Sequence, residues 1–150
     1  MKNKRILKSD QETKDFAKEL AKKLLDDKNP DQPVVIALTG DLGAGKTTFT
    51  QGFAKALGVK KRILSPTFLI MKRFTLPKDV GFKNLYHIDA YRISKEDLEE
   101  LEFKKALLNP NIIVIEWADR VKAVLPKGTI WLRFKHGSTE NERQITINRR

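Results

Sequence analysis

Residues 33–57 have the sequence PVVIALTGDLGAGKTTFTQGFAKAL, which predicts a strand, a glycine-rich loop and a helix in direct succession. The first part, residues 34–39, is an apolar run of strand length that stops at Gly40. After the loop, large apolar residues recur at every fourth position, at Phe49, Phe53 and Leu57. This spacing places them on one face of a helix, so the rest of the chain is expected to pack around this unit.

The loop matches the pattern G-x-x-x-x-G-K-[ST] at Gly40, Gly45, Lys46 and Thr47. Phosphate groups bind where backbone N–H groups converge, and Gly43 and Gly45 let the chain approach them without Cβ atoms in the way. The start of the following helix adds a positive partial charge. We therefore expect Lys46 to reach the β- and γ-phosphates and the Thr47 hydroxyl to bind Mg²⁺. A glycine turn followed by a solvated lysine is the alternative, and the flanking strand and helix disfavour it.

Length and composition fit one domain spanning residues 1–150. The formal net charge of +11 favours phosphate-rich or acidic partners. It does not establish nucleic-acid binding, because the lysines are spread along the chain and no platform of aromatic and basic residues is visible.

The chain has no cysteine, which excludes disulfides, thiolate metal sites and cysteine catalysis. The first residues lack an apolar signal segment, and no apolar run reaches the length of a membrane span. The sequence therefore predicts a cytoplasmic protein without a membrane partner.

The remaining pattern predicts further strands and helices on both sides of the loop. Ser9 and Glu12 form a capping box at the start of a helix. The other expected elements are an edge strand at 5–7, a hairpin of strands 69–74 and 84–88, a helix over 94–108, a buried strand at 112–115, a short helix over 118–125 and a final hairpin of 129–136 with 143–148. Together they predict an α/β fold of the P-loop NTPase type, with a mostly parallel central sheet, flanking helices and antiparallel hairpin additions.

Two of the expected strands end in carboxylates. Asp89 is a candidate to orient water or hold the metal, and a salt bridge to Arg92 is the equal alternative. Glu116 ends a strand expected to be buried, so it needs a partner, either Mg²⁺ or Arg120. The metal is favoured because of the glycine-rich loop. His87 is expected to be structural.

Two threonines are ambiguous from the residues alone. Thr13 lies in the first turn of a predicted helix, where a hydroxyl ordinarily faces solvent. Thr67 follows Ser65 and Pro66 in a stiff turn that could present a hydroxyl to the γ-phosphate or metal. A plain loop with a capping hydroxyl is the favoured interpretation of that turn.

Four motifs together resemble one family. They are GDLGAGKTT at 40–48, SPTF at 65–68, HIDAYR at 87–92 and EWADR at 116–120. In this order and spacing they resemble the TsaE (YjeE) ATPase family of tRNA threonylcarbamoyladenosine biosynthesis, and the resemblance spans nearly the whole chain.

The resemblance implies a bacterial, cytoplasmic ATPase that supports turnover of a complex of the TsaB and TsaD proteins. Contact with tRNA would be indirect, through that complex. The residues expected to bind ATP are Thr13, Asp41, Leu42, Gly43, Ala44, Gly45, Lys46, Thr47, Thr48 and Thr67. Mg²⁺ would be held by Thr47 and Glu116. The catalytic residues would be Asp89, which orients the attacking water, and Lys46, which neutralises phosphate charge.

The resemblance also implies that Trp117 lies beside the nucleotide, with buried packing as the default interpretation of this tryptophan. No arginine finger is assignable in the sequence, so slow hydrolysis without a partner is expected. One alternative function is a small-molecule or nucleotide kinase, although residues 78–108 contain no arginine-rich lid, only Arg92. The other is a non-hydrolysing module whose nucleotide state controls binding to partners.

Overall fold

The computed structural model describes residues 2–27, 32–41, 43–61, 63, 71–100 and 103–149. The strands are β1 (Lys2–Leu7), β2 (Val34–Gly40), β3 (Met71–Thr75), β4 (Asn84–Asp89), β5 (Ile112–Glu116), β6 (Ile130–His136) and β7 (Arg143–Arg149). The helices are α1 (Asp10–Asp26), α2 (Lys46–Ala56), α3 (Lys95–Glu100) and α4 (Phe103–Leu108), with 3₁₀ segments η1 (Lys78–Val80) and η2 (Ala118–Val124).

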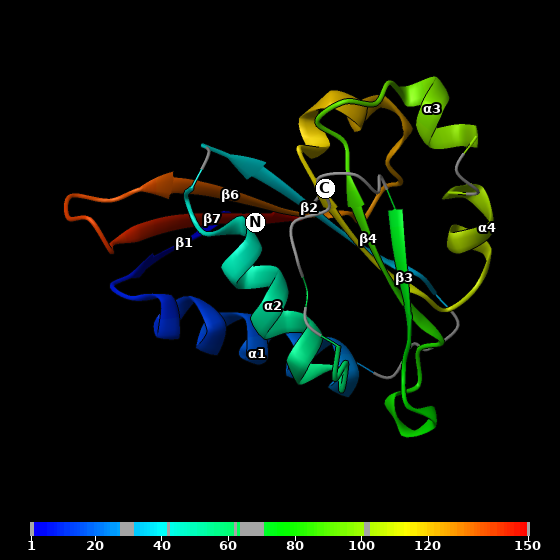
Figure 1. The fold of residues 1–150 in the computed structure, drawn as a ribbon, viewed down its shortest axis with the longest axis horizontal. Coiled ribbons are helices and arrows are strands. Elements are labelled where there is room, and N and C mark those ends of the chain that lie inside the picture. Colours follow the sequence, from blue (N-terminus) through cyan, green and yellow to red (C-terminus); the bar gives the residue numbers. More distant parts are fainter. Residues whose placement is uncertain are drawn as a thin grey trace.

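The described strands form one sheet in the order β1-β7-β6-β2-β5-β4-β3 (Figure 1). The pairings β6–β2, β2–β5 and β5–β4 are parallel, whereas β1–β7, β7–β6 and β4–β3 are antiparallel. The predicted α/β sheet with hairpin additions is therefore confirmed, and its parallel part is confined to the four central strands. β5 is buried along its whole length, as its continuous apolar run predicts.

Helices α1 and α2 cover one face of the sheet, and α3, α4 and η2 lie against the other (Figure 1). Under α2, the ring of Phe49 lies 5.9 Å from that of Phe16 in α1 and 5.8 Å from that of Phe134 in β6. Helices α1 and α2 are in close contact at Gly52. A Cβ at this position would lie only 2.9 Å from the Cα of Lys14. Helix α2 is thus fixed against both α1 and the sheet.

The start of α1 agrees with the capping-box prediction in part. The Glu12 N–H donates to Ser9 Oγ at 3.1 Å, as predicted. The Glu12 carboxylate accepts instead from the N–H of Lys8, at 2.6 Å, one residue before the cap. Both bonds still satisfy N–H groups at the helix start.

Two predicted helices differ in form. The expected helix over 94–108 is described as α3 and α4, with residues 101–102 outside the described part. Phe103 and Ala106 supply the buried positions of α4, while Leu108 is 82% exposed. The expected helix over 118–125 is the 3₁₀ segment η2, with non-helical backbone angles at Val121. In the described ranges, no helix combines the length and the apolar character that crossing a membrane requires.

Candidate functional site

Three neighbouring parallel strands, β2, β5 and β4, end at the same edge of the sheet. Glu116 at the end of β5 pairs in register with Leu38 of β2 and with Asp89 of β4. The two strand-end carboxylates are therefore adjacent, next to the loop that follows β2. This edge, outside the carboxyl ends of parallel strands, is where α/β sheets commonly bind ligands.

A cavity of about 280 Å³ lies at this edge and is called the site cavity below. Its lining residues are Asp10, Gly43, Gly45, Lys46, Thr47, Thr48, Asp89, Glu116, Trp117 and Arg143. The structure thus brings together most of the residues that the sequence analysis singled out. Asp10 and Arg143 were not predicted, since neither belongs to a recognisable motif.

The loop glycines are required by their backbone angles. Gly40, Gly43 and Gly45 all have positive φ, at 126°, 74° and 101°. A Cβ on Gly40 would lie 2.0 Å from the carbonyl oxygen of Phe134, because β6 pairs with β2 at this point. Gly45 is the N-cap of α2 and offers no side chain to the N–H groups of the first turn. These N–H groups are available to a ligand in the site cavity.

Lys46 is buried at the first position of α2. Its Nζ donates to the carbonyl oxygen of Gly40 at 2.7 Å and lies 4.0 Å from the centroid of the Trp117 ring. Burial lowers the pKa of Lys46, while the nearby carboxylates, Glu116 first among them, oppose that change. The site cavity therefore holds a partly desolvated cation whose hydrogen-bond partner is a neutral carbonyl.

Glu116 pairs with His87, which was not among its predicted partners. Its Oε2 lies 2.6 Å from His87 Nε2, and both side chains are buried. Arg120, the predicted alternative partner, instead lies over the ring of Tyr91, at 4.9 Å. The expectation of a structural role for His87 agrees with this contact, since the hydrogen bond ties β4 to β5.

Asp89 is half-buried, and its Oδ1 accepts the N–H of Tyr91 at 2.9 Å. The alternative salt bridge to Arg92 is not found among the described residues, whose ion pairs include Arg5–Glu19 and His87–Glu116. The hydrogen bond to the following turn fixes the carboxylate at the strand end, facing the site cavity.

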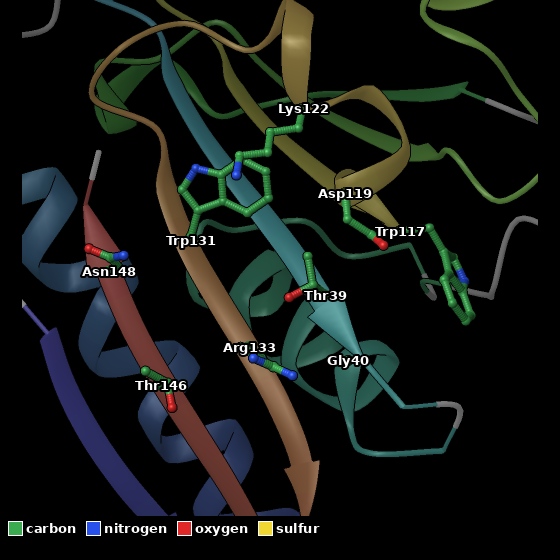
Figure 2. A pocket seen from close by; sticks show the side chains of 9 residues that line it. All are labelled: Thr39, Gly40, Trp117, Asp119, Lys122, Trp131, Arg133, Thr146 and Asn148. Atoms are coloured by element: carbon green, nitrogen blue, oxygen red, sulfur yellow. The ribbon is translucent and has the colours of Figure 1, made fainter.

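Trp117 is the one non-glycine residue of the described chain with positive φ, at 58°. Such a conformation is costly and is often found at functional sites. It brings the indole against Tyr91, with ring centroids 4.9 Å apart, and against Lys46. Trp117 also lines a second cavity of about 470 Å³ (Figure 2).

The second cavity lies on the sheet face opposite α1 and α2. Trp131 and Arg133 of β6 line it, with Thr146 and Asn148 of β7 beside them (Figure 2). Side chains alternate between faces along a strand, and the intervening Leu132 belongs to the core under α1 and α2. Trp117 therefore lines both the site cavity and the second cavity.

The other predicted nucleotide residues lie in different settings. Thr13 is 1% exposed and its Oγ1 donates to the carbonyl oxygen of Ser9 at 3.3 Å, so the solvent-facing expectation is wrong. Ala44 is buried, and its N–H donates to the carbonyl oxygen of the exposed Asp41 at 3.2 Å. Leu42 and Thr67 lie outside the described residues.

These features define an α/β protein in which a glycine-rich loop joins a central parallel strand to a helix, with strand-end carboxylates beside the loop. The family model of threonylcarbamoyl adenosine biosynthesis protein TsaE matches residues 7–145. The chain therefore belongs to the TsaE family, which confirms the predicted resemblance.

Individual relatives agree with this assignment. The chain is 39% identical over 113 residues to the tRNA threonylcarbamoyladenosine biosynthesis protein TsaE of Bacillus subtilis, covering 75% of this chain and 68% of that protein. It is 41% identical over 131 residues to the TsaE protein of Rickettsia prowazekii, covering 86% and 83%. The crystal structure of B. subtilis YdiB matches with a TM-score of 0.71 at 33% identity, covering 98% of this chain and 84% of that chain.

Proposed function

We propose that this protein binds ATP with Mg²⁺ in the site cavity and hydrolyses it in support of tRNA N6-threonylcarbamoyladenosine modification. The observation that carries the proposal is that the uncapped start of α2, Lys46 and two strand-end carboxylates line one cavity. This is the arrangement of a P-loop NTPase site. Membership of the TsaE family supports the role in tRNA modification.

Phosphate binding follows from the loop and the start of α2. The N–H groups of the first helical turn have no side-chain cap, and the helix adds a positive partial charge at this end. Lys46 is already held at the loop by the Gly40 carbonyl. A phosphate oxygen is a stronger acceptor for its ammonium group than a neutral carbonyl.

The donors in the site cavity fit Mg²⁺, which prefers oxygen ligands. The Thr47 hydroxyl and the Glu116 carboxylate would hold the ion, which when bound neutralises charge on the phosphates. The described residues contain no group of three or more histidines and carboxylates that could hold a metal ion by themselves. One or two protein oxygens suffice here, because Mg²⁺ usually keeps several waters and binds substrate phosphates as well.

Asp89 is the proposed residue that orients the attacking water. Its carboxylate is fixed by the Tyr91 N–H and lies across from Glu116 at the strand ends. Hydrolysis of a phosphoanhydride needs positioning and charge neutralisation rather than a covalent intermediate, and a fixed carboxylate supplies the positioning.

The proposed partners are TsaB and TsaD homologues in the cytoplasm, with tRNA contacted through their complex. The test is phosphate release from ATP and Mg²⁺, with and without the purified partners. We expect slow release alone and faster release with them. Release in neither condition would favour a nucleotide-dependent binding module, and transfer to an added nucleoside or metabolite would favour a kinase.

Variants tie this activity to the site cavity. Lys46→Ala is expected to lose ATP binding, whereas Lys55→Ala, on the exposed side of the same helix, should bind normally. Asp89→Ala should bind ATP but hydrolyse it about 100-fold more slowly or worse, a typical loss for a residue that positions or deprotonates the nucleophile. Asp79→Ala, an exposed carboxylate elsewhere, is the matched control. Wild-type turnover in Asp89→Ala would refute its role.

A further inference from the structure

Arg143, the first residue of β7, has a hydrogen-bond donor without a partner. Its Nε is the one buried side-chain nitrogen or oxygen of the described residues that makes no hydrogen bond. A buried donor on a charged group is costly to leave unsatisfied. Because Arg143 also lines the site cavity, a ligand there could supply the missing acceptor.

The Arg143 side chain lies directly against the glycine-rich loop. A Cβ built on Gly45 would lie 3.8 Å from Arg143 Cγ and 3.9 Å from its Nε. Gly45 is the N-cap of α2, so the guanidinium group reaches the uncapped end of that helix. The Nε donor is therefore close to Gly45, the residue at which the helix proposed to bind phosphate begins.

The turn between β6 and β7 fixes this side chain. Arg143 Nη1 donates to the carbonyl oxygens of Glu140 and Glu142, at 2.6 and 3.1 Å. The turn is closed in its own right, since the Gly137 N–H donates to the Glu142 carbonyl at 2.7 Å and Ser138 Oγ donates to the Glu142 carboxylate. An arginine held at one end in this way is pre-organised for a ligand.

Within the described part of the chain, no ion pair joins Arg143 to a carboxylate; pairs such as Arg5–Glu19 and His87–Glu116 involve other residues. Asp10 lines the same cavity but forms no ion pair with Arg143 within the described chain. A neutral carbonyl is thus the acceptor for Nη1, as it is for Lys46 Nζ. Two cations that line one cavity and have carbonyl oxygens as their hydrogen-bond acceptors suit a ligand with several negative charges.

We propose that Arg143 donates from Nε to a phosphate oxygen of the nucleotide bound at the glycine-rich loop. This inference rests on the proposed function and adds a second cation, from the C-terminal hairpin, to the one supplied by Lys46. Arginine suits the role because its fork of donors lets one nitrogen hold the turn while another contacts phosphate.

The test compares Arg143→Gln with Arg133→Gln by competition against a fluorescent ATP analogue. Arg133 lies on the paired strand β6 but faces the second cavity (Figure 2), so its replacement removes the same charge on the other side of the sheet. The competitors are ATP and inorganic tripolyphosphate, which has no base or ribose. We expect Arg143→Gln to weaken both by about 10- to 100-fold, as for the loss of a charged hydrogen bond, and Arg133→Gln to change either by less than about threefold.

Each other outcome overturns the proposal in a distinct way. Unchanged affinity for both competitors would show that Arg143 does not contact the ligand and only stabilises the turn. Weaker ATP binding with unchanged tripolyphosphate binding would place the contact at the base or ribose. A wild-type protein that binds neither competitor would refute the proposed function itself. If Arg143→Gln melts at a much lower temperature, Arg143→Lys carries the test, since it keeps the charge but cannot both hold the turn and contact phosphate. Weaker binding of both competitors is then expected again, and wild-type affinity for both would overturn the proposal.

Discussion

At the residue scale, Gly40 shows that a motif glycine can serve the fold as well as the ligand. An alanine here would have to adopt the positive φ of Gly40, and its Cβ would lie 2.0 Å from the Phe134 carbonyl oxygen. Neither strand can move away easily, because the two residues pair in the sheet. We expect Gly40→Ala to lower the free energy of unfolding by about 3 kcal/mol or more, measured by urea denaturation.

Gly81→Ala is the matched control for that measurement. Gly81 also has positive φ, at 88°, but a Cβ there would meet nothing within 4 Å. Gly81→Ala should therefore lower the free energy of unfolding only by the cost of a positive φ in a residue with a Cβ, about 1 kcal/mol. Equal losses in the two variants would mean that the close approach of β6 does not constrain Gly40.

The pKa of Lys46 gives a prediction for the pH dependence of ATP binding. Burial lowers this pKa, so Lys46 loses its charge at a lower pH than an exposed lysine. Phosphate binds the charged form, so affinity for ATP should fall as pH rises through the lowered pKa, by up to about tenfold per pH unit. Titrations of ATP into the protein at increasing pH measure this.

Lys46→Arg provides the comparison, because arginine keeps its charge throughout the accessible range. Its affinity is expected to be weaker than that of the wild type but nearly constant over the same pH interval. A parallel fall in both proteins would assign the pH dependence to another group.

At the element scale, the His87–Glu116 hydrogen bond joins β4 to β5 beneath the site cavity. His87→Leu would leave the Glu116 carboxylate buried without its partner, at a cost of about 3 kcal/mol in the free energy of unfolding. The double variant His87→Leu with Glu116→Leu should recover part of that loss, because neither polar group is then left unpaired. Urea denaturation of the wild type, the two single variants His87→Leu and Glu116→Leu, and the double variant gives the coupling energy. Strictly additive losses would contradict an interaction between the two residues.

The same pair shows what sequence patterns could and could not predict. The strand patterns placed Asp89 and Glu116 at strand ends, and His87 was expected to be structural. The partner of Glu116 depends on which strands are neighbours and in what register, and this is decided by tertiary pairing. Arg120 is near Glu116 in sequence, but its guanidinium group lies over the Tyr91 ring instead. Periodicity also gave the apolar face of the segment after Ser94 without locating the boundary between α3 and α4.

At the scale of the whole molecule, the strand–loop–helix unit and both hairpins could be predicted, because each is local in sequence. The sheet order could not. It brings β7 beside β6 and β1 beside β7, so the two ends of the chain pair with each other. This long-range pairing places Arg143 beside the glycine-rich loop and Asp10, the first residue of α1, at the site cavity. Neither position could be predicted from local sequence patterns.

Because the site cavity joins segments from both ends of the chain, ATP should stabilise the whole protein. A ligand at 100 times its dissociation constant contributes about 2.7 kcal/mol by mass action, or a rise in Tm of roughly 5–11 °C for a chain of this size. The net charge of +11 raises a competing explanation, since any polyanion could bind such a surface weakly. Thermal melts with ATP should therefore include Lys46→Ala and Lys55→Ala. Each removes one positive charge, but only Lys46 lines the site cavity, so only Lys46→Ala should lose the shift. An equal rise in both variants would assign the stabilisation to the general surface charge and not to the site.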